Sequence, residues 1–121
     1  MAEHNDIGKQ GEQIALKFLK DKGYKILETN WRLGRNEIDI IAMDGKIIVV
    51  AEVKTRQSNS FGEPEIAVTR EKQKALVRAA NAYVRLKHLD LEVRFDIISI
   101  ILEKDSEKIN HIADAFYPLL R

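Results

Sequence analysis

The sequence predicts one α/β domain in which helices cover both faces of a central mixed sheet of four to five strands. The chain of 121 residues is long enough for a single packed core, and 45% of its residues are hydrophobic while 32% are charged. Its hydrophobic pattern alternates between helical spacing and strand runs, and a strong hairpin signal separates two of the runs. The predicted element order is α-β-β-β-α-β-β, within a single domain at residues 1–121.

The first half of the chain predicts a helix followed by three strands. Asn5 or Asp6 is expected to cap the helix, which ends near residue 22 because Gly23 suits a left-handed helix exit. Gly8 and Gly11 cost this helix stability, so we expect another backbone to pass close to its first turns. The strand patterns lie at residues 24–32, 37–43 and 46–54.

The second half of the chain predicts another helix and one or two further strands. A polar loop at residues 57–65 precedes Thr69, which is expected to cap a helix that runs to about residue 87. The strand after this helix is expected to run parallel to one of the first three. A clear strand pattern lies at residues 92–102 and a weaker one at residues 108–116.

Composition and charge exclude several kinds of site. The chain has no cysteine, which rules out disulfides, zinc-thiolate centres and thiol nucleophiles. Its first residues are polar, and no apolar run is long enough to span a bilayer, so we expect a cytoplasmic protein without a membrane partner. The net charge is only +1, but residues 54–87 carry a basic stretch. This stretch is either a nucleic-acid contact or a solvated helix face.

Acidic residues gather at the open end of the predicted hairpin. A two-residue turn at Asp44-Gly45 fixes the register and makes Asp39 and Glu52 diagonal neighbours on one face, with Cβ atoms about 6–8 Å apart. Lys54 lies on the same face, because residues two apart in a strand point to the same side. Hard divalent cations take carboxylate oxygens as ligands, so the pattern favours a metal site. The alternative is a ring of ion pairs at the strand ends.

These residues resemble a known nuclease signature. Asp39, followed after twelve residues by Glu52-Val53-Lys54, resembles the D…(D/E)xK signature of the PD-(D/E)XK nuclease superfamily. The segments GKQGEQIALKFL, GYKILETNWR, NEIDIIAMDG, VVAEVKTR, FGEP and RFDIISI resemble the YraN-like family of small bacterial proteins, described as endonucleases related to archaeal Holliday-junction resolvases. The likeness covers about residues 7–116 and implies a restriction-endonuclease-like fold, although Ile38 stands where the superfamily name has proline.

The resemblance implies a metal-dependent endonuclease that hydrolyses phosphodiester bonds in DNA. Asp39 and Glu52 would bind Mg²⁺ or Mn²⁺ together with the Val53 carbonyl, and Glu12 would approach the same ion directly or through water. Lys54 would position and help to deprotonate the attacking water, or hold the scissile phosphate. The alternative is a catalytically silent module that keeps the nuclease fold and binds nucleic acid or serves a partner protein.

Several residues around this constellation have two interpretations each. Gln73 is either an auxiliary polar residue of the site or an exposed helix residue, and Trp31 either stacks on an unpaired strand or belongs to the core. Glu37 is either a helper ligand or an ordinary strand-end charge, and Asp96 is expected to bind backbone groups or Arg94. The likeness to resolvases also suggests branched DNA and a homodimer, while RNA stays open as a substrate. The residues expected to contact a phosphate backbone are Arg56, Arg70, Lys72, Gln73, Lys74 and Arg78.

Overall fold

The computed structural model describes residues 2–58 and 68–116, and the side chains from residue 6 onward within those ranges. The described elements follow the predicted order, and both strands expected after the second helix are present. The predicted loop at residues 57–65 lies outside the described residues from position 59 onward. The elements are α1 (Ala2–Asp21), β1 (Lys25–Leu33), β2 (Asn36–Asp44), β3 (Ile47–Gln57), α2 (Arg70–Leu86), β4 (Val93–Leu102) and β5 (Glu107–Phe116).

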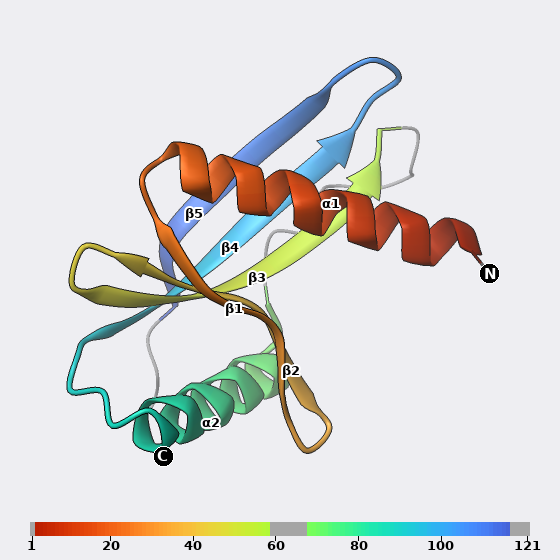
Figure 1. Cartoon of the computed structure of the whole chain (residues 1–121). Helices are drawn as coiled ribbons and strands as arrows, with labels where there is room; N and C mark the ends of the chain where they lie inside the picture. The colour runs from red at the N-terminus through yellow and green to blue at the C-terminus, as the bar shows by residue number, and fades with distance from the viewer. Residues whose placement is uncertain (1, 59–67, 117–121) are drawn as a thin grey trace.

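The strands form one five-stranded mixed sheet in the order β1-β2-β3-β4-β5 (Figure 1). β3 and β4 run parallel, joined through α2, and all other neighbouring strands are antiparallel. The predicted parallel pair is therefore β3 with β4. A parallel neighbour needs a crossover connection, which α2 supplies.

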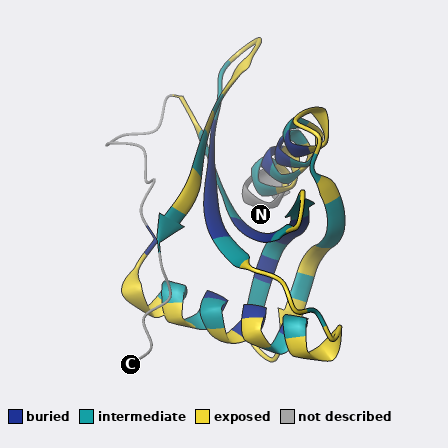
Figure 2. Cartoon of the chain, turned by 90° about the vertical axis from the view of Figure 1, so that its left-hand side faces the viewer, coloured by how far each residue is buried: buried dark blue, intermediate teal, exposed yellow. Residues whose placement is uncertain are grey.

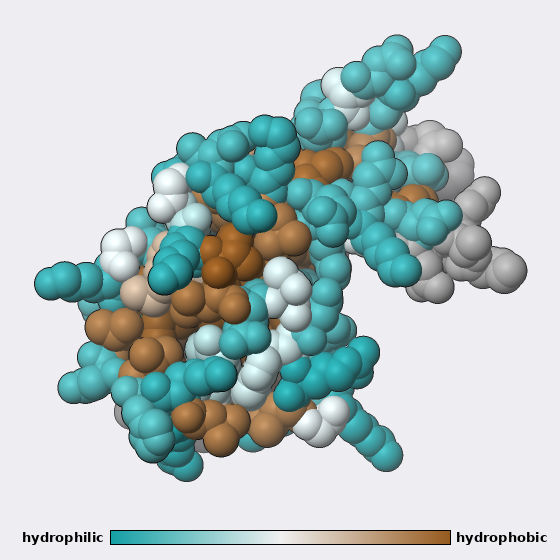
Figure 3. Space-filling model, viewed as in Figure 1, coloured by the Kyte–Doolittle hydropathy of each residue, from teal (hydrophilic) through white to brown (hydrophobic). Residues whose placement is uncertain are grey.

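The two helices cover opposite faces of the sheet, as Figure 2 shows. On the α1 side, Ala15 and Leu19 belong to a buried cluster with β-strand residues that include Val49. On the α2 side, Leu76 packs in a second cluster with residues that include Val50. Because each face has its own core, β2, β3 and β4 are apolar on both sides along much of their length. On the surface in Figure 3, hydrophobic side chains gather between the two helices, and hydrophilic side chains surround them.

α1 begins earlier than the sequence predicted and packs closely against β3. Since it starts at Ala2, Asn5 and Asp6 lie inside the helix and do not cap it. Its end is as predicted, because Gly23 has a φ of 93°. A Cβ atom at Gly11 would overlap the side chain of Thr55, whereas no atom of the described residues lies within 4 Å of the position that a Cβ would take at Gly8. The expected close approach is therefore correct at Gly11, with a side chain as the neighbour, and wrong at Gly8.

The hairpin between β2 and β3 turns one residue later than the sequence predicted. Asp44 pairs with Ile47, so Gly45 and Lys46 form the turn. Gly45 supplies a positive φ of 62°, while Asp44 stays in the strand and its carboxylate accepts a hydrogen bond of 2.9 Å from Arg94. The change moves every predicted cross-strand pair by one position on each strand. Residues keep their predicted faces along most of the hairpin, because the pairing shifts by an even total number of positions.

β2 pairs with β3 only in the half of the hairpin nearest the turn, and beyond that half the two strands separate. Their described pairing ends at Ile40 and Ala51, although β3 stays paired with β4 as far as Gln57. β2 instead continues with β1, and this outer hairpin bends toward α2 in Figure 1. Ile38 accordingly joins the α2-side cluster. Strict alternation would place Ile38 on the same face as Ile40, and the separation of β2 from β3 breaks this alternation.

Candidate functional site

Asp39 lies at the point where β2 separates from β3. The register of the paired residues, continued by one position, would set Asp39 directly opposite Glu52, whereas the sequence predicted a diagonal pair. The strands separate here, but the charge of Glu52 still acts on the Asp39 carboxyl group. Asp39 Oδ2 accepts a hydrogen bond of 2.8 Å from the backbone N–H of Val53. The Asp39 side chain thus takes the place of a β2 backbone acceptor in the gap. The N–H and C=O of one strand residue face the same neighbour, so the Val53 carbonyl also faces this gap.

The Asp39 carboxyl group has a strongly raised affinity for a proton. Burial is the largest cause, followed by the charge of Glu52, and together they raise the pKa of Asp39 to about 7. The charges of Glu12 and Glu37 act in the same direction, while the hydrogen bond from Val53 opposes them. The site therefore concentrates negative charge where water is partly excluded, which is unfavourable without a cation.

Glu52 is held on the α2 side of β3 with part of its carboxylate unsatisfied. Its side chain is only 13% exposed, and Oε2 lies 3.9 Å from the Lys72 ammonium. Burial raises the pKa of Glu52, against the nearby charges of Lys72 and Lys54. Oε1 is buried and has no hydrogen-bond partner among the described residues. A buried carboxylate oxygen without a partner is costly, so this atom marks a position where a cation or a donor would be stabilising.

Glu12 comes close enough to affect Asp39 but is turned toward β1. Both of its carboxylate oxygens lie 3.3 Å from Nδ2 of Asn30, which has a positive φ of 50°. Within residues 2–58 and 68–116, no three acidic or histidine side chains converge tightly enough to hold a metal ion by themselves. The described groups at the split that could serve as metal ligands are therefore the carboxylates of Asp39 and Glu52, with the Val53 carbonyl facing the gap beside them.

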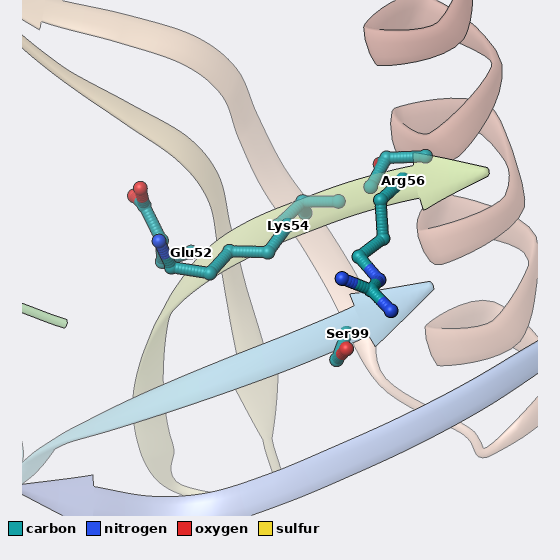
Figure 4. Close-up of a pocket in the computed structure, with 6 residues that line it drawn as sticks. Glu52, Lys54, Arg56 and Ser99 are labelled. Atoms are coloured by element: carbon teal, nitrogen blue, oxygen red, sulfur yellow. The ribbon is translucent and has the colours of Figure 1, made fainter. Parts of the chain in front are cut away.

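Beyond Glu52, β3 lines an open pocket of about 330 Å³. Figure 4 shows the Lys54 side chain extending along the strand toward Glu52, whereas Arg56 bends toward Ser99 on β4. The sequence prediction that Glu52 and Lys54 share a face agrees with this arrangement. The residues that line the pocket are Glu52, Val53, Lys54, Thr55, Arg56 and Ser99.

The predicted basic residues of α2 do not form one surface. Lys72 and Gln73 are half-buried near the sheet, and Gln73 Nε2 donates a hydrogen bond of 2.9 Å to the Val68 carbonyl. Gln73 is thus not the exposed helix residue of one interpretation, and its side chain ties down the start of α2. The three remaining basic side chains are exposed at four-residue spacing along another side of the helix, namely Arg70, Lys74 and Arg78.

Two of the residues with open interpretations take structural roles. The Trp31 ring packs edge-on against Tyr83, with centroids 5.2 Å apart, so Trp31 belongs to the α2-side core. Glu37 lies 3.9 Å from Arg32, which fits an ordinary strand-end charge that also adds to the field at Asp39. Asn30 and Ser99 are the neighbours of the site that the sequence did not reveal. For Ser99 a signal existed, because it interrupts the apolar series of Phe95, Ile97 and Ile101 on one face of β4.

Asp96 forms a separate buried network on the α1 side of the sheet. It accepts hydrogen bonds from Arg94 and from the backbone N–H of Asp114, as the sequence predicted. His111 Nε2 lies 2.7 Å from Asp96 Oδ2, and His111 Nδ1 lies 2.8 Å from the Lys22 ammonium. Asp96 is therefore a structural anchor whose carboxylate is already satisfied.

Comparison with known proteins assigns the chain to a family. A model described as "Uncharacterised protein family UPF0102" matches residues 11–100. A UPF0102 protein of Flavobacterium psychrophilum is 54% identical over 117 residues, covering 97% of this chain and 98% of the relative. A UPF0102 protein of Bacteroides thetaiotaomicron is 49% identical over 120 residues, covering 99% of each chain. This chain belongs to the UPF0102 family.

The UPF0102 match includes the whole candidate site. Residues 11–100 contain Glu12, Asp39, the Glu52-Val53-Lys54 segment and Ser99. The resemblance to small bacterial YraN-like proteins is confirmed at the level of family membership. Among the described residues, neither helix of this UPF0102 protein is long and apolar enough to cross a membrane.

Proposed function

We propose that this protein is a metal-dependent endonuclease that hydrolyses phosphodiester bonds in DNA. One observation carries the proposal: a half-buried pair of facing carboxyl groups, Asp39 and Glu52, lies at the split between β2 and β3 beside Lys54 and an open pocket. Ordinary strand-end ion pairs lie in solvent and do not raise the pKa of a carboxyl group. This pair is instead poised to exchange a proton for a cation.

The chemistry of the donor set fits Mg²⁺ or Mn²⁺. Asp39, Glu52 Oε1 and the Val53 carbonyl offer only oxygen ligands, which hard divalent cations prefer. Glu52 Oε1 is buried and has no hydrogen-bond partner in the described chain, so a cation there would satisfy it. Glu12 would complete the set through a water molecule, since its oxygens contact Asn30. The bound ion would supply a Lewis acid for the phosphoryl oxygens and lower the pKa of its water.

The two nearby lysines would act on the substrate. Lys54 shares the pocket with Glu52, so its ammonium would position the attacking water or hold the scissile phosphate. Lys72, 3.9 Å from Glu52 Oε2, balances part of the negative charge. Since Lys72 begins the sheet-facing side of α2, it would move only a short distance to reach a phosphate oxygen. The branched-DNA preference and the homodimer suggested by the resemblance remain predictions.

Calorimetric titration with Mn²⁺ and Mg²⁺ tests the ion site without any choice of substrate. We expect wild-type protein to bind Mn²⁺, and both Asp39→Asn and Glu52→Gln to weaken binding by at least about tenfold, because even indirect partners of a metal cost 10–100-fold in affinity. Asp90→Asn is the matched control, since Asp90 is exposed and outside the site. Equal Mn²⁺ affinity in all four proteins would contradict the site.

Cleavage assays test the reaction itself. Four-way junctions, flaps and nicked duplexes are incubated with Mn²⁺, and product is followed on denaturing gels. We expect wild-type cleavage of at least one structured substrate, and losses of at least about a hundredfold in Asp39→Ala and Glu52→Ala. Cleavage at the wild-type rate in both variants would refute the proposal.

A second candidate is a catalytically silent module that binds nucleic acid. The orientation of Glu12 toward Asn30 favours it, because a third carboxylate is then not directed at the ion. It predicts DNA binding that weakens as salt rises and that falls further in Lys72→Glu or Arg78→Glu, with no turnover in any divalent cation. Cleavage that depends on Asp39 and Glu52 would exclude it.

A further inference from the structure

The α2-side face of β3 and β4 changes character at Glu52. Up to that point, the face is apolar core, with Ile48 and Val50 from β3 packed beside Phe95 and Ile97 from β4. The next residues on the same face are polar and line the pocket, although their strands remain fully paired. Polar side chains thus take the place of apolar core on a rigid stretch of sheet, and they line an open pocket.

The polar stretch contains two separate groups of side chains. Glu52, Lys54 and Arg56 occupy alternate positions of β3, so each successive side chain is displaced by about 6.6 Å along the same face. Lys54 extends toward Glu52, and Arg56 bends the other way toward Ser99, as Figure 4 shows. Ser99 is only 4% exposed and pairs with Lys54 across the parallel ladder. Arg56 therefore lies one two-residue repeat of β3 beyond Lys54 and two repeats beyond Glu52.

We propose that Arg56 and Ser99 form a second phosphate subsite, which holds the backbone phosphate next to the one that is cleaved. The inference deepens the proposed function and rests on it, since the DNA strand would lie along β3 and extend from the carboxylates toward Arg56. Lys54 would contact the scissile phosphate, and Arg56 would contact its neighbour through its planar guanidinium. The Ser99 hydroxyl would donate a hydrogen bond to the same phosphate from the floor of the pocket.

Charge and geometry favour a phosphate over other ligands at this subsite. Among the described residues that line the pocket, Arg56 supplies a cation and Ser99 a hydroxyl at the end beyond Lys54. Guanidinium and hydroxyl donors together match the acceptor oxygens of a phosphodiester. Arg56 and Ser99 would contact only the phosphate backbone of the DNA, so the subsite would not recognise bases. It would instead fix the position of the DNA strand relative to the ion.

The test compares thymidine 3′,5′-bisphosphate with thymidine 5′-monophosphate and 3′-monophosphate, titrated calorimetrically in Mg²⁺. The bisphosphate spans two adjacent phosphate positions, whereas each monophosphate occupies one. We expect wild-type protein to bind the bisphosphate about tenfold more tightly, because a hydrogen bond to a charged group contributes about that factor. Arg56→Gln should reduce this preference to near unity, and Ser99→Ala should reduce it about threefold.

Matched variants separate the subsite from general electrostatics. Arg85→Gln removes one exposed charge at the far end of α2 and should keep the tenfold preference. Arg56→Lys keeps the positive charge but lacks the planar guanidinium group, so it should retain part of the preference for the bisphosphate. A wild-type preference near unity, or one that survives in Arg56→Gln, would overturn the subsite. If Arg56→Gln does not fold, an unchanged preference in Ser99→Ala overturns it instead.

The outcomes also distinguish this inference from the proposed function. A bisphosphate preference that depends on Arg56, in a protein that neither binds Mn²⁺ nor cleaves DNA, supports the phosphate subsite on a silent binding module. Mn²⁺-dependent cleavage without any bisphosphate preference supports the nuclease and overturns the subsite.

Discussion

At the scale of single residues, the two facing carboxyl groups make the metal-free site a weak point of the fold. Asp39 and Glu52 are both half-buried or more. Burial and the charge of Glu52 raise the pKa of Asp39, and burial raises the pKa of Glu52. The hydrogen bond from Val53 only partly compensates at Asp39. Such a cost is typical of functional sites, where stability is given up for chemistry.

Replacing Asp39 with asparagine should therefore stabilise the metal-free protein. The pKa of Asp39 is raised to about 7 by burial and by Glu52, Glu12 and Glu37. Between about pH 4 and pH 7, the folded protein then binds more protons than the unfolded chain, so wild-type stability falls as pH rises. The asparagine side chain cannot ionise, and its amide oxygen can still accept from Val53. We expect Asp39→Asn to be about 1–3 kcal/mol more stable than wild type at pH 8 and nearly equal at pH 4.

Urea unfolding in EDTA at several pH values measures this difference. The predicted signature is the growth of the stability gain between pH 4 and pH 7. A gain that is constant with pH would mean that the substitution acts through packing, and a loss at pH 8 would contradict the prediction.

The contact between α1 and β3 depends on Gly11 having no side chain. A Cβ there would overlap Thr55, which follows Lys54 in β3, so Gly11→Ala must displace the helix or the strand. We expect a loss of about 1–3 kcal/mol in the free energy of unfolding, despite the better helix propensity of alanine. Gly8→Ala is the matched control: in the described part of the chain nothing lies within 4 Å of its Cβ position, and it should stabilise by about 0.5–1 kcal/mol. Equal effects of the two substitutions in urea melts would contradict the proposed close packing.

At the scale of elements, most of the fold was predictable because local pattern and tertiary structure agree. The faces of β2 and β3 were correct even though the turn lies one residue later, since the shift preserves the alternation of side chains. The position of Ile38 on the α2 side was not predictable, because β2 leaves β3 there and a separation between strands has no local sequence pattern. The hydrogen bond from Gln73 to the Val68 carbonyl was not predictable, because it depends on how the preceding segment folds back.

The separate anchor that Asp96 provides between β4 and β5 should control the acid stability of the protein. Burial alone would raise the pKa of Asp96, but hydrogen bonds from His111, Arg94 and the Asp114 N–H lower it to about 2. The folded pKa lies below the unfolded value, so the contribution is present above about pH 4 and is lost as pH falls toward 2.

Asp96→Asn should cost about 3–5 kcal/mol at pH 7, because it leaves Arg94 without its buried partner. The variant should also lack the part of the stability decline between pH 4 and pH 2 that comes from Asp96. Chemical denaturation of both proteins at pH 7, 4 and 3 measures the two effects. Parallel pH profiles would show that Asp96 does not control acid stability.

At the scale of the whole molecule, the sheet has a core on each face and an opening where two of its strands part. The α1-side and α2-side clusters meet across β2 and β3, and Asp39 lies at the end of that shared region. An ion held between Asp39 and Glu52 would link the bent β1–β2 hairpin to the β3–β4 pair. Ligation at the split would therefore stabilise the fold as a unit, because the ion binds the folded state only.

Thermal unfolding with Mn²⁺ tests this coupling. At a free Mn²⁺ concentration a hundredfold above Kd, we expect a stabilisation of about 2.7 kcal/mol, which corresponds to a rise in Tm of about 10 °C for a domain near this size. The rise should disappear in Asp39→Asn and Glu52→Gln, reverse with EDTA, and persist in Asp90→Asn. It should also increase from pH 5 to pH 8, because Mn²⁺ and a proton compete for the same carboxylates. A Tm that rises equally in the carboxylate variants would assign the ion to another part of the molecule.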